Sequence, residues 1–174
     1  GLGDVYKRQD HVYEAWNNKE DGQAREDDWK AIFDDYSENY SKEHSEIERI
    51  FSNSLPEELE KIFEELIESF SNDETHYASR KASGICLDSL GPRIPELFGG
   101  SADLSPSNNT QWKGSEFLEN GTGNYLSYGV REFGMSAIMN GLYLHGGFRP
   151  YGGTFLTFLD YARNAVRMSA LMTV

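Results

Sequence analysis

The first half of the chain places its apolar side chains at the three- and four-residue spacing of amphipathic helices. One stripe begins near Gly22 and a shorter one follows, and their apolar members are Trp29, Ile32, Phe33 and Tyr36, then Ile47, Ile50 and Phe51. A third stripe runs from Leu59 to Phe70, and we expect residues 54–57 (Ser-Leu-Pro-Glu) to form its capping box. A fourth helix is expected from about residue 78 to residue 90, where Gly91 and Pro92 stop it.

Beyond Pro92 the pattern changes to short apolar runs that alternate with loops and helices, which is typical of α/β folds. We expect strands at 97–98, 125–129 and 148–153, the last being a strand or a loop. A polar loop spans 101–123, and helices span 132–144 and 154–172. Ligands of such folds bind at the carboxyl ends of the strands.

Charge divides the chain in the same way. Residues 1–80 hold 22 acidic and 9 basic side chains, whereas residues 81–174 hold 7 of each. So acidic a surface repels phosphate backbones and anionic lipids, and we therefore expect no nucleic acid and no membrane partner. The domain division that follows is an unassigned segment at 1–10, in which residues 1–9 resemble an artefact, acidic helices at 11–76, and an α/β domain at 77–174.

The single cysteine, Cys86, excludes an internal disulfide and suits a reducing compartment. We expect a cytoplasmic protein, or a plastid protein if a transit peptide is missing from this sequence.

Candidate chemistry gathers where the predicted strands end. Asp103, Glu132 and Phe155 each follow a strand and are expected to face one crevice. Glu132 has apolar neighbours, and a carboxyl group removed from water exchanges protons more readily with a ligand near neutral pH. Position alone leaves a plainer reading open, since an acid also suits the positive end of a helix dipole. The aromatic stripe at Phe155 and Phe158 likewise fits a buried core.

Four motifs in order give a more specific signal. They are Gly-Gly-Ser-Ala-Asp-Leu-Ser-Pro-Ser-Asn at 99–108, Tyr-Gly-Val-Arg-Glu-Phe-Gly-Met at 128–135, His-Gly-Gly-Phe at 145–148 and Tyr-Ala-Arg-Asn-Ala-Val-Arg at 161–167. Together they closely resemble the transketolase family, weakly from about residue 11 and strongly from Ser79 onward. The resemblance implies a thiamine diphosphate-binding three-layer α/β/α fold with a partial parallel sheet, preceded by acidic α-helices. The helices at 11–76 would be the linker from the diphosphate-binding domain, and 77–174 a truncated pyrimidine-binding domain.

The resemblance also implies roles for individual residues. Glu132 would be the catalytic acid that hydrogen-bonds the pyrimidine ring nitrogen of thiamine diphosphate. The aromatic pocket around that ring would be Phe155, Phe158 and Tyr161, with Asp103 as an acid near the cofactor. Arg80 and Ser107 would contact the substrate phosphate, for which a guanidinium and a hydroxyl are suitable donors.

The family's activity is transfer of a two-carbon ketol unit from a ketose phosphate to an aldose phosphate, in the pentose phosphate pathway or the Calvin cycle. The family's metal and diphosphate motif, Gly-Asp-Gly followed by Asn, does not occur in this sequence. We therefore expect a fragment that is inactive alone, with the ligands of Mg²⁺ or Ca²⁺ lying outside it. A homodimer with the active site at its interface is implied, with helix 132–144 and the Arg163 region near that interface.

Two other interpretations stay open from the residues. One is another thiamine diphosphate-dependent transferase, of the deoxyxylulose-phosphate synthase or phosphoketolase type. The other is a non-catalytic transketolase-like module, against which the intact Glu132 and aromatic residues argue.

Overall fold

A computed structural model describes residues 9–174, so the expectation of an artefactual segment at 1–9 falls almost wholly outside the described residues. The chain divides into two compact units, 1–46 and 47–174. The first contains α2 (Asp10–Trp16), which the hydrophobic pattern did not predict, and α3 (Lys19–Asn39). Helix α4 (Ser41–Phe51) carries the chain into the second unit. No described helix has the length and apolar character needed to cross a membrane.

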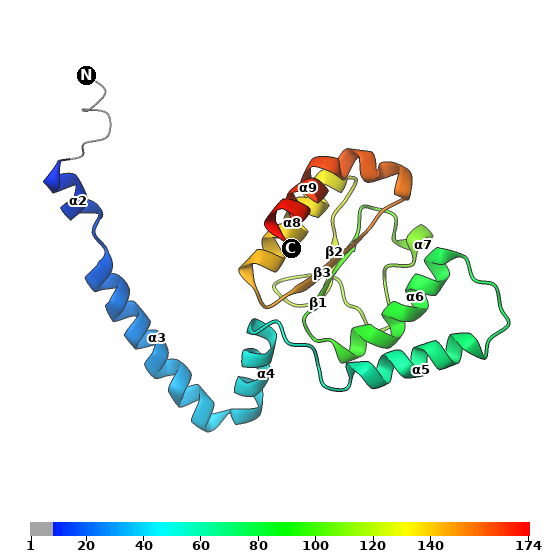
Figure 1. Ribbon diagram of the computed structural model, residues 1–174, viewed down its shortest axis with the longest axis horizontal. Helices are drawn as coiled ribbons and strands as arrows, with labels where there is room; N and C mark the ends of the chain where they lie inside the picture. Colours follow the sequence, from blue (N-terminus) through cyan, green and yellow to red (C-terminus); the bar gives the residue numbers. More distant parts are fainter. Residues whose placement is uncertain (1–8) are drawn as a thin grey trace, which may run out of the picture. The chain divides into compact units, whose positions relative to one another are not determined.

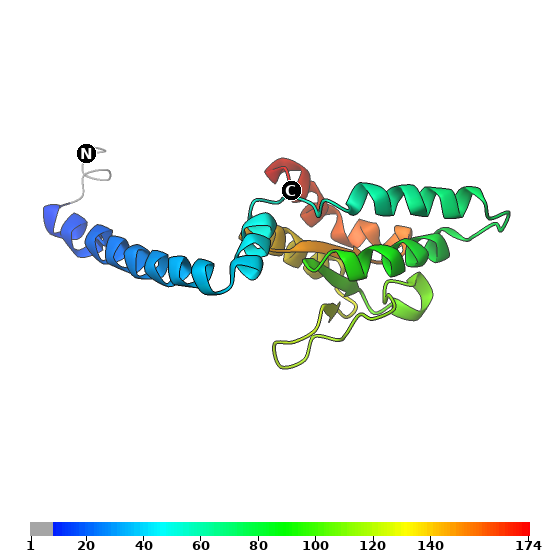
Figure 2. The same ribbon diagram turned by 90° about the horizontal axis from the view of Figure 1, so that it is seen from below.

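Two amphipathic helices follow α4 and pack on each other. They are α5 (Leu59–Ser71) and α6 (Ser79–Leu90), and they lie side by side in Figures 1 and 2. Leu59 and Ile62 of α5 form an apolar cluster with Ile94, and Leu97 packs against it. The apolar stripes therefore predicted these helices correctly.

The predicted capping box at 54–57 is wrong. Helix α5 begins only at Leu59, and its N-cap Glu58 makes no side-chain capping hydrogen bond. Ser54 is instead hydrogen-bonded to the end of α4, because its carbonyl accepts a hydrogen bond from Arg49 (2.6 Å) and its hydroxyl lies 3.0 Å from that of Ser52. The capping motif at 54–57 does not form, because Ser54 makes its contacts with the end of α4 instead.

A parallel sheet of three strands forms the centre of the second unit. The strands are β1 (Leu97–Ser101), β2 (Tyr125–Ser127) and β3 (Arg149–Gly153), in the spatial order β2-β1-β3. The first strand is longer than the expected 97–98, since Gly99 and Gly100 also pair inside it. A Cβ atom on Gly99 would lie 2.0 Å from the Tyr151 carbonyl oxygen, so glycine is what allows the neighbouring strand to approach.

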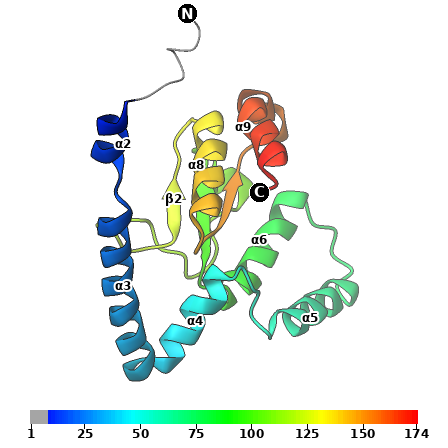
Figure 3. The same cartoon turned by 60° about the vertical axis from the view of Figure 1, so that its left-hand side comes forward.

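Helices cover both faces of this sheet (Figure 1). After β2 comes α8 (Glu132–His145), and after β3 come a 3₁₀ turn, η2 (Leu156–Phe158), and α9 (Leu159–Met172). Figure 3 shows α8 and α9 side by side. Met135 of α8 is buried with Ala102 and Tyr128, whereas Leu97 faces the α5 and α6 cluster. The expected three-layer α/β/α arrangement around a partial parallel sheet is confirmed.

The long loop between β1 and β2 includes a short helix, α7 (Ser105–Asn108), and the 3₁₀ turn η1 (Gly91–Arg93) leads from α6 towards β1. In Figure 2 the stretch from about 109 to 124 extends as a yellow-green arm away from the helices.

The single long helix predicted at 154–172 is instead divided, with η2 preceding α9.

Two arginines converge on a buried acid at the amino ends of β1 and β3. Glu96 is 5% exposed and accepts two hydrogen bonds from Arg49, at 3.0 and 2.9 Å, and one from Arg149 at 3.2 Å. Arg149 also donates to the carbonyl of Asn53 at 2.7 Å. Burial favours the neutral acid, but hydrogen bonds and charge from Arg49 and Arg149 outweigh it and lower the pKa of Glu96. This clamp fixes the end of α4 to the sheet.

Candidate functional site

The carboxyl edge of the sheet is where the predicted site residues come together. Because β1, β2 and β3 are all parallel, the segments after them leave the sheet at the same edge. Asp103 follows β1, Glu132 opens α8 after β2, and Phe155 follows β3. Their placement at this edge was predicted correctly from the sequence; whether they act in chemistry stays a prediction.

Glu132 is held at its position by a sharp change of chain direction between β2 and α8. Gly129 has a positive φ of 69°, and the Arg131 amide donates to the Gly129 carbonyl at 2.7 Å. The Arg131 guanidinium also donates to the carbonyl of Tyr128 at 3.1 Å. These contacts fix the first turn of α8, at which Glu132 is the opening residue.

Glu132 is only 7% exposed, although its side chain is a carboxylic acid. Among the described residues 9–174, no side-chain hydrogen bond or ion pair with another residue engages its carboxylate. Tyr128 and Met135, on either side of it in sequence, belong to the apolar cluster beneath α8. A polar group on a largely buried residue, without a protein partner, is a candidate for contact with a ligand.

Three aromatic rings follow β3 in a continuous row. The Phe155 and Phe158 rings are stacked with centroids 5.9 Å apart, and Tyr161 continues the row 6.1 Å from Phe158. Phe155 is 39% exposed and Tyr161 is 68% exposed, which rules out the fully buried core that a periodic stripe would otherwise predict. Open, aligned rings of this kind suit a flat heterocycle.

Helix register brings these rings level with Glu132. Helices α8 and α9 start from the same sheet edge, and Asn140 of α8 donates to the Ala165 carbonyl of α9 at 3.0 Å. The Ser169 hydroxyl donates to the Asn140 side chain at 2.6 Å. Moving two helical turns back along both helices leads from Asn140 to the opening of α8 and from Ala165 to the start of α9. The acid and the aromatic row therefore share the same end of the helix pair.

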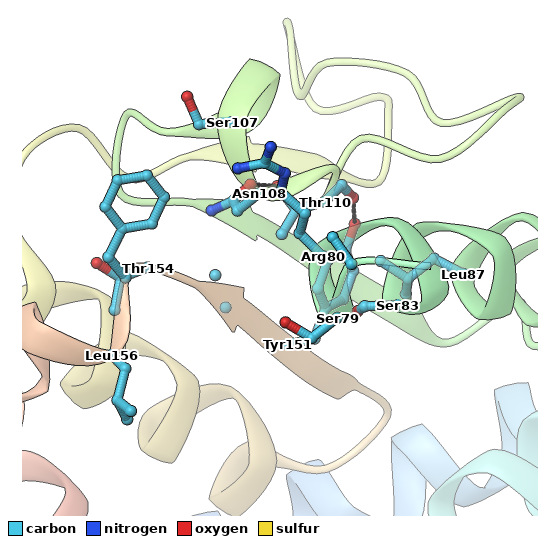
Figure 4. Close-up of a pocket in the computed structure, with 14 residues that line it drawn as sticks. Ser79, Arg80, Ser83, Leu87, Ser107, Asn108, Thr110, Tyr151, Thr154 and Leu156 are labelled. Atoms are coloured by element: carbon cyan, nitrogen blue, oxygen red, sulfur yellow. Dashed lines mark hydrogen bonds between the residues drawn. The ribbon is translucent and has the colours of Figure 1, made fainter. Parts of the chain in front are cut away.

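A cavity of about 820 Å³ opens beside this row (Figure 4). Both predicted phosphate contacts line it, Arg80 from the start of α6 and Ser107 from α7, and Phe155 forms part of the wall. In Figure 4 the guanidinium end of Arg80 reaches towards the turn that carries Ser107 and Asn108. The structure thus joins Arg80, Ser107 and Phe155 around one space, although they are far apart in the sequence.

Four predicted residues lie outside the cavity lining, namely Asp103, Glu132, Phe158 and Tyr161. Asp103 is exposed and has a positive φ of 62°, so its backbone shapes the turn after β1. Thr154 does line the cavity, and its hydroxyl oxygen is buried without a hydrogen-bond partner among the described residues. No group of three or more metal-ligating side chains occurs within the described range.

A buried polar network under the cavity was not predicted from the sequence. Thr110 donates to the Asn108 side chain at 2.8 Å and lies 3.0 Å from the Tyr125 hydroxyl. Tyr151 donates to the Thr110 carbonyl at 3.1 Å, and Figure 4 draws the Thr110–Asn108 and Tyr151–Thr110 bonds as dashed lines. Burial raises the pKa of Tyr151, so it stays a hydrogen-bond donor. These polar residues lie within a loop and at strand positions whose pairing depends on distant segments, which periodicity does not reveal.

Comparison with known proteins gives a consistent result. Residues 75–174 match the family described as the transketolase pyrimidine-binding domain. Transketolase 1 of Vibrio vulnificus strain CMCP6 is 51% identical over 165 residues, which are 94% of this chain and 25% of that protein. Transketolase 1 of Escherichia coli K12 is 49% identical over 162 residues, 92% of this chain and 24% of that protein.

Solved structures agree with the sequence matches. A Pichia stipitis transketolase in complex with sedoheptulose 7-phosphate superposes with a TM-score of 0.77 at 38% identity, covering 87% of this chain and 23% of that one. The transketolase of Leishmania mexicana gives a TM-score of 0.80 at 35% identity, covering 95% and 24%. The chain spans about a quarter of the length of the curated relatives it matches. On these grounds the chain belongs to the transketolase family, and its residues 75–174 belong to the family's pyrimidine-binding domain.

Proposed function

We propose that this chain supplies the pyrimidine-binding half of a transketolase active site. The complete protein would transfer a two-carbon ketol unit from a ketose phosphate to an aldose phosphate. The observation that carries the proposal is the carboxyl of Glu132, a residue only 7% exposed, which has no protein partner among the described residues and lies at the same end of the helix pair as the row of open aromatic rings. The relatives named above are transketolases, which favours this reaction over the other thiamine-dependent transferases.

The residues present fit a bound thiamine diphosphate. Glu132 offers a hydrogen-bonding acid with no competing partner among the described residues, and Phe155, Phe158 and Tyr161 offer aromatic surface. The unpartnered Thr154 hydroxyl marks the junction between β3 and the aromatic row as a place for a polar ligand group. When bound, the cofactor supplies the carbon nucleophile that carries the two-carbon unit.

Each residue has a physical task in this proposal. Glu132 holds a proton at its carboxyl oxygen and shares it with the pyrimidine ring nitrogen, which fixes the ring's orientation. The aromatic row excludes water from the ring face. Arg80 and Ser107 hold the substrate phosphate at the far side of the cavity, so that the reacting carbonyl is positioned by a remote group.

The same arrangement supports a homodimer. Phe133, Leu144 and Leu171 on α8 and α9 are 53%, 58% and 60% exposed, an apolar surface that a second copy would cover.

Ligands for Mg²⁺ or Ca²⁺ would come from segments outside this chain. A cytoplasmic or plastid location stays a prediction, as does the role of Asp103 near the cofactor.

Activity is testable by grafting, because the chain corresponds to one quarter of its relatives. The stretch of Vibrio vulnificus transketolase 1 that matches this chain is exchanged for it, and thiamine diphosphate-dependent ketol transfer is measured. We expect an active grafted enzyme, and we expect Glu132→Ala to lower its kcat/KM by about three orders of magnitude or more. The melting temperature without cofactor should change little.

Glu60→Ala is the matched control, since Glu60 also lies in the first turn of a helix but is exposed. Near-normal turnover of the Glu132→Ala graft would reject the proposed role. An inactive graft with a normal melting profile would reject the proposed function itself.

A further inference from the structure

The turn that carries Ser107 rests on a chain of buried hydroxyl and amide groups. The Ser101 hydroxyl, at the end of β1, accepts hydrogen bonds from the Leu104 amide at 3.0 Å and the Asn108 side chain at 2.8 Å. It donates to the carbonyl of Gly153, at the end of β3, at 3.2 Å. One side chain therefore joins the ends of two strands to the turn between them.

The network continues inward through Thr110 to Tyr125. The Thr110 hydroxyl donates to the Asn108 side chain at 2.8 Å and also contacts the Tyr125 hydroxyl, which in turn contacts the hydroxyl of Ser105. Tyr125 is fully buried and Thr110 is 7% exposed. Both ends of α7, Ser105 and Asn108, are thus tied to the same buried pair.

Close packing leaves this turn no alternative position. A Cβ atom on Gly153 would lie 2.3 Å from the Thr110 methyl carbon and 2.8 Å from the Asn108 side-chain nitrogen. The turn therefore sits directly on the backbone of β3. Buried polar groups that are fully hydrogen-bonded hold a single arrangement, because any displacement leaves one of them unpaired.

Cavity lining and network overlap in four residues. They are Asn108, Thr110, Tyr151 and Gly153, which belong to the network and also line the cavity that Arg80 and Ser107 share. Ser107 is exposed and lies between the tied residues Ser105 and Asn108. The hydrogen bonds of Ser105 and Asn108 therefore determine where the Ser107 hydroxyl lies relative to Arg80.

We propose that Thr110 and Tyr125 are positioning residues for the phosphate end of the substrate. They hold α7 so that Ser107 and Arg80 bind one phosphate together, and they do not themselves need to touch the reacting carbonyl. This inference rests on the proposed function and adds to it the residues that determine preference for phosphorylated sugars.

Thr110 offers a matched pair of substitutions. Thr110→Val keeps the methyl packing against Gly153 but removes the hydroxyl, whereas Thr110→Ser keeps the hydroxyl and removes the methyl. Both are made in the grafted enzyme and assayed with fructose 6-phosphate and with fructose, which lacks the phosphate. Inorganic phosphate is used as a competing anion.

The ratio of kcat/KM for fructose 6-phosphate to that for fructose should fall about tenfold in Thr110→Val, mostly through a higher KM. Inhibition by inorganic phosphate should weaken by a similar factor. Thr110→Ser should keep the ratio within about twofold of the unsubstituted graft, because the hydrogen bonds remain. Tyr125→Phe, which removes only the hydroxyl at the other end of the bond, should act as Thr110→Val does.

An active graft in which both Thr110→Val and Tyr125→Phe keep the ratio and the phosphate inhibition would overturn this inference alone. Equal losses on both sugars would also overturn it, since they would indicate a general structural role. Should Thr110→Val lower the melting temperature so far that no folded enzyme is obtained, Tyr125→Phe decides the matter. An inactive unsubstituted graft overturns the proposed function, and this inference with it.

Discussion

Gly100 shows how closely single residues determine this fold. A Cβ atom there would lie 2.0 Å from the Leu126 carbonyl oxygen, which is part of the pairing between β1 and β2. Gly100→Ala should therefore lower the melting temperature of the grafted enzyme strongly, by the equivalent of about 3 kcal/mol or more. Gly22→Ala is the control, because Gly22 lies in α3, where a Cβ atom would meet nothing within 4 Å and alanine favours the helix. Equal melting temperatures for the two variants would contradict the packing argument.

Tyr128 gives a residue-scale prediction for pH. Burial raises the pKa of its phenol to about 12, so the folded protein keeps the proton through the range where an exposed tyrosine loses it. The sign follows from linkage: stability contributed by the protonated phenol is present below pH 10 and is lost as the pH rises towards 12. An ultraviolet difference titration of the graft against its Tyr128→Phe variant should show this phenol ionising near pH 12. Ionisation near pH 10 would contradict its burial.

The clamp between α4 and the sheet belongs to the scale of elements. Glu96→Gln would leave Arg49 and Arg149 facing a neutral partner, and it should destabilise the grafted enzyme by about 2 kcal/mol. Glu58→Gln is the control, because Glu58 pairs with Arg93 at 3.7 Å on the surface and should matter little. Thermal melting of both variants provides the measurement.

The clamp also predicts a dependence on pH. The folded-state pKa of Glu96 is lowered, so its contribution is present above the unfolded value and is lost as the pH falls through the folded one. The difference in melting temperature between the graft and Glu96→Gln should therefore shrink in acid. A difference that stays constant from neutral to strongly acidic pH would show that the ion pairs contribute nothing.

Elements with strong local signals were predictable from the sequence. The stripe at Leu59 and Ile62 predicted α5, and the Tyr128-to-Met135 motif placed Glu132 at the opening of α8. The capping box failed because Ser54 is held by Arg49 instead, and the first strand was cut short because its glycines serve close strand pairing. The Glu96 clamp and the Tyr125–Thr110 contact join residues far apart in the chain, and neither produces a periodic pattern in the sequence.

At the scale of the whole molecule, the isolated chain should associate with itself. Within residues 9–174, one edge of the sheet, β3, is unpaired, and the other, β2, is paired on its outer side only at Tyr125, with Phe117. Helices α8 and α9 also carry exposed side chains such as Phe133, Leu144 and Leu171. Unpaired strand edges and large apolar surfaces favour aggregation. Sedimentation of the 174-residue chain should therefore show species larger than a monomer, and replacing Leu144 and Leu171 by glutamate should reduce them. A soluble monomer with a sharp cooperative melt would contradict this.

The central claim is that Glu132 meets the pyrimidine ring of thiamine diphosphate, and a crystal structure of the grafted enzyme with that cofactor tests it most directly. We expect a carboxyl oxygen of Glu132 within about 3 Å of a pyrimidine ring nitrogen, with the ring against Phe155 and Phe158. A Glu132 carboxyl turned to bulk water, or a ring bound away from the aromatic row, would contradict it.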